Sequence, residues 1–205
     1  MCFHSKQGKD AQSLEKRFNA KLKNKDLVVN SERFNGFTFP KTPVITNVNK
    51  QEIQFFNWGL IPSWAKDEQF RANTLNARIE TISELPSFKN NVKNRCLILV
   101  DGFYEWKWLD VKGKEKQQYL ISLPNDELFA FAGIYSEWTN KNTGELLQTY
   151  SIVTTEANSF MAKIHNTKKR MPVILTPENE YDWLNETKNL KEFKSCNIDL
   201  KAIAI

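Results

Sequence analysis

The chain has 205 residues, of which 26% are charged and 40% hydrophobic, and its formal net charge is +5. This length suffices for one substantial hydrophobic core, and the composition excludes a disordered or collagen-like chain. No apolar run approaches the roughly 18 residues of a membrane-spanning helix, and we expect no signal peptide because MCFHSKQGKD is polar from the start.

The charge and the cysteine content indicate which partners and which cellular compartment to expect. The basic excess favours polyanionic partners, although the scattered lysines fit a solvated basic face equally well. The three cysteines form no CxxC pair, which is typical of a reduced, cytoplasmic chain without disulfides. With only two histidines, they lack the paired spacing of a four-ligand zinc site, so we expect no metal.

The predicted elements begin with a helix and continue mainly as short strands. Leu14, Phe18 and Leu22 recur every fourth residue and predict an amphipathic helix over residues 11–23. Strands are predicted at 53–56, at the apolar run 96–100, in a hairpin of 104–109 with 117–123, in a hairpin of 128–138 with 146–155, and at 173–175. Further helices are predicted over 79–92, interrupted by Pro86, over 158–164, and after Thr176.

This order of elements predicts the fold class. Strands in the middle and helices towards the ends indicate an α+β fold, in which a mainly antiparallel, curved sheet forms a partial β-barrel flanked by helices. No repeat, linker or low-complexity segment divides the chain, so we expect one domain over residues 1–205 and a monomer.

The second residue is a cysteine, which methionine aminopeptidases expose when they remove Met1. The new α-amine has an ordinary pKa of roughly 7.7–8.0 and the thiol one of about 8.5, so both are partly nucleophilic near neutrality. An aldehyde can form an imine with the amine and then a five-membered thiazolidine ring with the thiol. By position alone, however, Cys2 is more often an accidental second residue.

Two aromatic segments offer binding or proton-transfer groups. Residues 57–66 read NWGLIPSWAK, and Trp58 and Trp64 fit either a core turn or a platform for stacked nucleobases. Residues 101–106 read DGFYEW and place Glu105 among aromatic residues, where burial raises a carboxyl pKa and suits it to acid–base chemistry. A glutamate at a strand edge with its carboxylate in water is the alternative.

Four polar residues could assist such chemistry. Asn76 and Arg78 lie two apart in NARIET and point the same way on an extended segment, where the guanidinium suits phosphate or is simply exposed. His165 and His4 are the two histidines, and His4 lies beside Cys2. Histidine is suited to proton transfer at neutral pH, although a lone histidine is more often structural.

Taken together and in order, these motifs resemble one family. The chain starts with MC and continues with WGLIPSWAK, NARIET, CLILVDGFYEW, FAGIY, TTEAN and IH…RMPVIL. Over roughly residues 1–175 this pattern is similar to the SRAP family (SOS response-associated peptidase), the abasic-site processing proteins.

The resemblance implies a basic groove for single-stranded DNA, and a mature N-terminal cysteine that captures the ring-opened aldehyde of an abasic site as a thiazolidine. That crosslinking, lyase-type chemistry shields the lesion, needs no cofactor, and places the protein at the nucleoid. The resemblance implies that Cys2 is the nucleophile, that Asn76 orients it, that Glu105 is the acid–base group and that His165 assists ring opening and reversal. It also implies DNA-binding roles for Arg78, Trp58, Trp64, Trp106, Arg170 and His4.

The chain departs from the family pattern at three places. Phe3-His4 replaces Gly-Arg, which removes one phosphate contact unless His4 supplies it or acts as a second base. The loop 35–40 differs, and the spacing from His165 to Arg170 is longer, so the position of Arg170 relative to DNA stays open.

Two other functions remain compatible with the sequence. The first is a thiol peptidase that uses Cys2 to attack an amide, with removal of its own Met1 as the minimal activity. The second is a single-stranded DNA binder without catalysis, which would bind intact and abasic strands equally well and form no covalent product.

Overall fold

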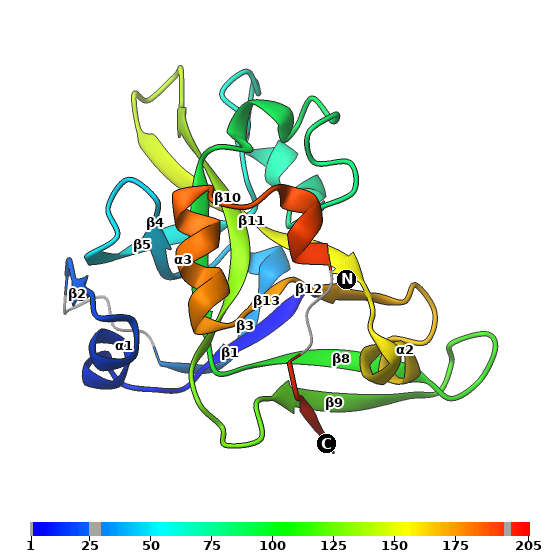
Figure 1. Ribbon diagram of the computed structural model, residues 1–205. Helices are drawn as coiled ribbons and strands as arrows, with labels where there is room; N and C mark the ends of the chain where they lie inside the picture. Colours follow the sequence, from blue (N-terminus) through cyan, green and yellow to red (C-terminus); the bar gives the residue numbers. More distant parts are fainter. Residues whose placement is uncertain (1, 25–29, 195–197) are drawn as a thin grey trace.

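The computed structural model describes residues 2–24, 30–194 and 198–205 (Figure 1). Its strands are β1 (His4–Gln7), β2 (Lys21–Leu22), β3 (Ser31–Asn35), β4 (Lys41–Thr46), β5 (Glu52–Trp58), β6 (Asn76–Arg78), β7 (Arg95–Val100), β8 (Gly102–Trp108), β9 (Lys116–Ser122), β10 (Phe129–Thr139), β11 (Leu146–Glu156), β12 (Arg170–Pro172), β13 (Ile174–Leu175) and β14 (Lys201–Ala204). The α-helices are α1 (Ala11–Phe18), α2 (Ser159–Ile164) and α3 (Pro177–Asn185), and 3-10 turns occur at η2 (Gly36–Thr38), η3 (Glu68–Asn73), η4 (Lys89–Asn91) and η5 (Leu190–Lys194).

Five strands of the larger sheet close into a barrel. Neighbours pair antiparallel in the order β11-β10-β7-β4-β5, and β5 then returns to β11 by a parallel pairing. That closing contact places Thr149 opposite Asn57 and Tyr150 opposite Trp58. The predicted α+β class with a curved sheet is confirmed, and the ring closes where we expected only a partial barrel.

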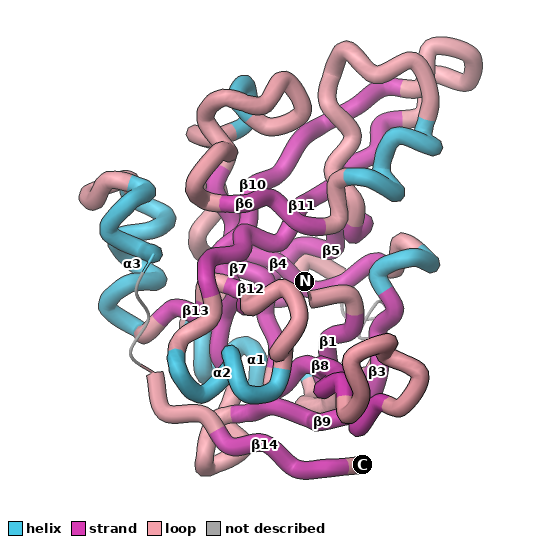
Figure 2. The backbone as a smooth tube through the Cα atoms, turned by 90° about the vertical axis from the view of Figure 1, so that its right-hand side faces the viewer, coloured by secondary structure: helices cyan, strands magenta, loops and turns pink. Residues whose placement is uncertain are grey.

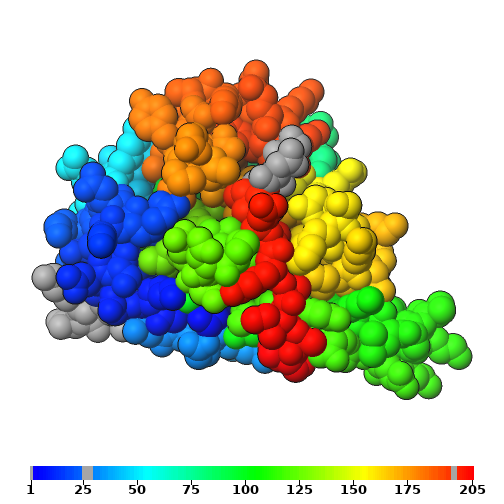
Figure 3. Space-filling model, turned by 60° about the horizontal axis from the view of Figure 1, so that its bottom comes forward, coloured from blue at the N-terminus to red at the C-terminus, as the bar shows by residue number. Residues whose placement is uncertain are grey.

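A second sheet, in the order β14-β9-β8-β1-β3, lies below the barrel strands (Figure 2). Both predicted hairpins are confirmed: β8 pairs with β9 from Phe103 opposite Ile121 to Trp108 opposite Lys116, and β10 pairs with β11. The β8–β9 hairpin, green in Figure 3, extends beyond the rest of the molecule.

The core lies on both faces of the central strands. In β7, Cys96, Ile98 and Val100 pack into one hydrophobic cluster while Leu97 and Leu99 pack into the other. Because both faces are covered, this strand is a continuous apolar run rather than an alternating one, as predicted. The helix α3 packs against β7 and adds the fully buried Trp183 to the cluster that contains Leu97 and Leu99.

Two helix predictions need correction. The first helix ends at Phe18 rather than near residue 23, because Asn19 adopts a left-handed conformation and caps it. Residues 79–92 form turns and the short η4 instead of an α-helix. Pro86 lacks an amide hydrogen and disfavours a helical residue before it, which explains the failure.

The other two predicted helices are confirmed, and each begins after a capping residue. Asn158 accepts a hydrogen bond from the Met161 amide at the start of α2. Thr176 accepts one from the Asn179 amide at the start of α3, whose first residue is Pro177. Among the described residues, none of the helices has the length and apolar character needed to cross a bilayer.

Candidate active site

The site begins with Cys2, which immediately precedes β1. The pairing of β1 with β8 sets His4 opposite Tyr104, so the residues before His4 run alongside Glu105 and Trp106. The Cys2 side chain has no exposed surface, and its thiol lies 3.6 Å from the His4 carbonyl oxygen, to which it donates. Burial, and then the nearby charge of Glu105, raise the pKa of the thiol well above its ordinary value. Met1 lies outside the described residues.

Asn76 fixes the backbone of Cys2 from the barrel side. It stands at the start of β6, where it lies opposite Ile152 of β11 in a parallel pairing. Its Nδ2 donates a 2.9 Å hydrogen bond to the Cys2 carbonyl oxygen, whereas its Oδ1 is buried and finds no partner among the described residues. The amide therefore orients the cysteine and keeps one acceptor available beside it.

Glu105 is the titratable group at the centre of the site. It stands in the middle of β8, and only 3% of its surface is exposed. Burial raises the pKa of this carboxyl from 4.5 to about 7. A carboxyl with a pKa near neutrality can both donate and accept a proton at physiological pH.

His165 is the second titratable side chain of the site, and it stands at the C-terminal cap of α2. Its Nδ1 lies 2.8 Å from the Arg170 carbonyl oxygen and 3.1 Å from the Arg170 amide nitrogen. The tautomer decides whether Nδ1 donates to the carbonyl oxygen or accepts from the amide, and in both cases the Arg170 backbone holds the ring at this nitrogen. Burial is the main cause that lowers its pKa below 6.5. The imidazole is therefore largely neutral at pH 7.

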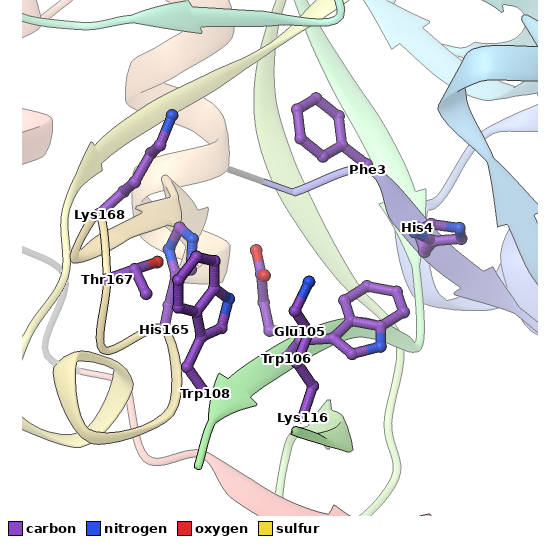
Figure 4. A pocket seen from close by; sticks show the side chains of 9 residues that line it. All are labelled: Phe3, His4, Glu105, Trp106, Trp108, Lys116, His165, Thr167 and Lys168. Carbon is purple, nitrogen blue, oxygen red and sulfur yellow. The ribbon is translucent and has the colours of Figure 1, made fainter. Parts of the chain in front are cut away.

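These groups surround one cavity of about 320 Å³ (Figure 4). Four of the residues singled out from the sequence meet there, namely His4, Glu105, Trp106 and His165, and Cys2 and Asn76 adjoin them. The full lining is Phe3, His4, Glu105, Trp106, Trp108, Lys116, His165, Thr167 and Lys168.

The tryptophans expected at DNA have three different environments. Trp58 is fully buried, donates to the Leu75 carbonyl oxygen at 2.9 Å and stacks on Tyr150. Its assignment to DNA is wrong for a direct contact, because a ring without exposed surface cannot stack on a base. Trp64 is 49% exposed but packs on Phe70 and lies outside the cavity lining, whereas Trp106 lines the cavity.

The two arginines also differ. Arg78 is exposed and borders a second hollow next to the cavity, together with Lys168 and Lys169. Arg170 is buried, forms a bidentate ion pair with Glu80 at 2.9 and 2.8 Å, and donates to the Thr154 carbonyl oxygen. These bonds direct both terminal nitrogens of the guanidinium to protein acceptors, which argues against a phosphate contact for Arg170 and fixes the residue whose backbone holds His165.

Several residues of the site carried no recognisable motif. Arg33 of β3 lies 4.8 Å from the Tyr104 ring and 5.5 Å from the Trp106 ring, next to His4. Burial and the charge of Arg33 lower the pKa of His4, so the cation at this edge is Arg33 rather than His4. Phe3, Trp108, Lys116, Thr167 and Lys168 complete the lining, and only the pairing of distant strands brings them there.

A buried cysteine at position 2, a carboxyl with a pKa near neutrality and a neutral histidine lie together beside a β-barrel, and they define the class: a protein with a candidate cysteine nucleophile. No three His, Cys, Asp or Glu side chains in the described part of the chain gather as metal ligands. The sequence matches the SOS response associated peptidase (SRAP) family over residues 1–202, and the chain belongs to that family.

Two relatives are similar in sequence over about two thirds of this chain. It is 47% identical over 150 residues to the abasic site processing protein YoqW of Bacillus subtilis, covering 71% of this chain and 64% of YoqW. It is 33% identical over 161 residues to the abasic site processing protein HMCES of Gallus gallus, covering 67% of this chain and 46% of HMCES. The alignments thus span less than two thirds of these relatives.

Solved structures share the fold. A crystal structure of a protein from Bacteroides thetaiotaomicron has a TM-score of 0.90 at 36% identity, covering 100% of this chain and 92% of that one. A protein from Bordetella bronchiseptica has a TM-score of 0.83 at 24% identity, covering 100% and 99%, and shows the same fold.

Proposed function

We propose that this protein captures abasic sites in single-stranded DNA as a covalent thiazolidine on Cys2. The observation that carries the proposal is the placement of Cys2 beside a buried carboxyl with a pKa of about 7. The relatives named as abasic site processing proteins support the substrate. The protein acts as a single domain, in the cytoplasm at the nucleoid, and as a monomer on this proposal.

The reaction is a condensation with loss of one water. The α-amine of mature Cys2 attacks the aldehyde carbon of the ring-opened sugar, and Glu105 protonates the departing oxygen. The thiol then adds to the imine carbon, and its proton passes to the nitrogen by way of Glu105. Because the thiol pKa is raised, the amine acts first and the thiol stays protonated until ring closure.

The neighbouring groups hold the reactants in place. Asn76 keeps the Cys2 carbonyl fixed, and its unpartnered Oδ1 can accept a hydrogen bond from the new α-amine. The neutral His165 can take a proton from the sugar hydroxyl as its ring opens. Such positioning is worth several kcal/mol of barrier in favourable cases.

The test uses protein whose loss of Met1 has been confirmed by intact mass. Incubation with single-stranded DNA carrying one abasic site should give a slow band on a denaturing gel. Cys2→Ala should give none unless borohydride is added, because its remaining amine forms only a hydrolysable imine. Cys96→Ala removes the buried thiol of β7 and is the matched control, which should crosslink like the wild type.

The outcomes separate this proposal from its rivals. Absence of a band with the wild type, or an equal band with Cys2→Ala, contradicts the proposal. Cleavage of Met1 by a purified chain that still carries it would favour the peptidase. Equal affinity for intact and abasic strands without a covalent product would favour a non-catalytic binder.

A further inference from the structure

The cavity extends to both sides of Glu105, and the two ends differ. At one end Trp106 packs edge-on against His4, with ring centroids 4.9 Å apart. At the other end lie Trp108, Thr167 and Lys168, and Lys116 lies between the two tryptophans in this view (Figure 4). An abasic site inside a strand has a nucleotide on each side, and with the abasic sugar at Glu105 the two ends of the cavity are the nearest surfaces for these neighbours.

Trp108 is held in position by two contacts. The Asn166 side chain accepts a hydrogen bond from the Trp108 amide at 3.0 Å and donates one to the Trp108 carbonyl oxygen at 2.9 Å. Gly113, at φ +65°, lies so close to the indole that a Cβ there would approach ring carbons to 2.5 Å. The hairpin turn therefore supports the ring, and Asn166 ties its backbone to the segment that follows His165.

The charge around Trp108 suits a nucleotide. The Lys116 Nζ lies 5.1 Å from the centroid of the Trp108 ring. Lys168 lines both this cavity and the hollow that contains Arg78, so cationic side chains continue from the indole outward. An aromatic wall next to lysines is the arrangement that binds single strands by stacking on bases and neutralising phosphates.

The abasic sugar itself cannot account for this wall, because it carries no base to stack. We infer that Trp108 forms a subsite for the nucleobase next to the abasic sugar, with Lys116 and Lys168 beside its phosphate. This inference rests on the proposed function and adds a contact through which the protein reads the neighbour of the lesion.

The test measures binding without chemistry. Mature protein is titrated with single-stranded oligonucleotides in which tetrahydrofuran replaces the abasic sugar. One oligonucleotide has adenine on both sides, and two others replace the 5′ or the 3′ adenine with a propanediol spacer. Stacking on one aromatic ring predicts that one of the two spacers weakens wild-type binding roughly tenfold.

Variants separate stacking from a structural role of the ring. Trp108→Ala should bind the adenine oligonucleotide roughly tenfold more weakly and should lose the penalty for the spacer. Trp108→Phe should retain part of the penalty, and Leu109→Ala, at an exposed apolar neighbour, should behave as the wild type. The comparison is made between oligonucleotides within each variant, so a general loss of folded protein cancels.

Two results would overturn the inference: no penalty for either spacer in the wild type, or the same penalty in Trp108→Ala. Crosslinking to DNA with a true abasic site is measured in parallel. A wild type that crosslinks but ignores its neighbours refutes only the subsite, whereas a wild type that does not crosslink refutes the proposed function.

Discussion

Residues 57–66 and strand β8 each carry two tryptophans, but the tryptophans of the two segments have different surroundings. Trp58 closes the barrel from inside, where it stacks on Tyr150 and donates to the Leu75 carbonyl oxygen. Trp106 and Trp108 of β8 line the cavity that also contains Glu105. The difference arises from the partner strands: β5 pairs on both sides inside the ring, whereas β8 belongs to the second sheet and ends in a protruding hairpin.

The stability of the barrel and the binding of DNA therefore depend on different tryptophans on this proposal. Removing the barrel tryptophan Trp58 should lower the free energy of unfolding, and removing a cavity tryptophan should change DNA binding with little loss of stability. The following predictions probe that separation, starting with the largest expected effect.

Trp58→Ala is expected to lower the free energy of unfolding by about 3–5 kcal/mol, since it empties a fully buried site and leaves the Leu75 carbonyl oxygen without its donor. Trp106→Ala should cost about 1 kcal/mol, because that ring is only partly buried. Urea unfolding of both variants measures the difference. An equal loss in the free energy of unfolding for both variants would contradict the view that only Trp58 is needed for stability.

Glu105→Gln should slow crosslinking roughly 100-fold, because the amide cannot relay protons. The same change should stabilise the protein at high pH. The folded carboxyl has a pKa of about 7 against 4.5 when unfolded, so wild-type stability falls as the pH rises from 4.5 through 7. Glutamine removes this loss, which amounts to about 3 kcal/mol at pH 8 and vanishes near pH 4.

Urea unfolding at these two pH values, beside crosslinking rates, checks both effects of Glu105→Gln. Glu145→Gln, at an exposed glutamate in the β10–β11 loop, is the matched control and should change neither. A Glu105→Gln variant that gains no stability at pH 8 would contradict the raised pKa.

Asn166→Ala should destabilise the protein by about 1–2 kcal/mol, because two hydrogen bonds to the Trp108 backbone are lost. It should also slow crosslinking several-fold, since the loop after His165 is no longer tied to the strand that carries Glu105. Urea unfolding and crosslinking rates measure both. Asn142→Ala, in the exposed β10–β11 loop, should change neither quantity. An Asn166→Ala variant that is destabilised but crosslinks at the wild-type rate would show that the two sides of the cavity act independently.

Arg78→Ala has the smallest expected effect. If its guanidinium neutralises one phosphate, the slope of log affinity against log salt should fall by about 0.7 for a single strand. Titrations with single-stranded DNA at several salt concentrations measure this slope. Lys141→Ala removes an exposed charge away from both hollows and should leave the slope unchanged.

The sequence predicts local features of the fold well. The apolar run at 96–100, both hairpins, the helix over 158–164 and the helix start at Thr176 depend on neighbouring residues, and the structure has them in place. The closure of the ring between β5 and β11 depends on residues more than ninety positions apart, Asn57 and Thr149, so no spacing pattern reveals it.

The same limit applies to the site. Glu105, His165, His4 and Trp106 meet as the ordered motifs suggest. The ion pair of Arg170 with Glu80, ninety positions earlier, is invisible in a motif that reads only RMPVIL, and it turns an expected phosphate contact into a structural one. Arg33 was missed because nothing in its own segment signals that β3 lies beside β1.

The most direct test of the account is the intact mass of the crosslinked complex after treatment with borohydride. A thiazolidine on mature Cys2 predicts the mass of the chain without Met1 plus that of the DNA, less one water, with no hydrogen added. A complex that retains Met1, or one that gains two hydrogens as a reduced imine does, would contradict it.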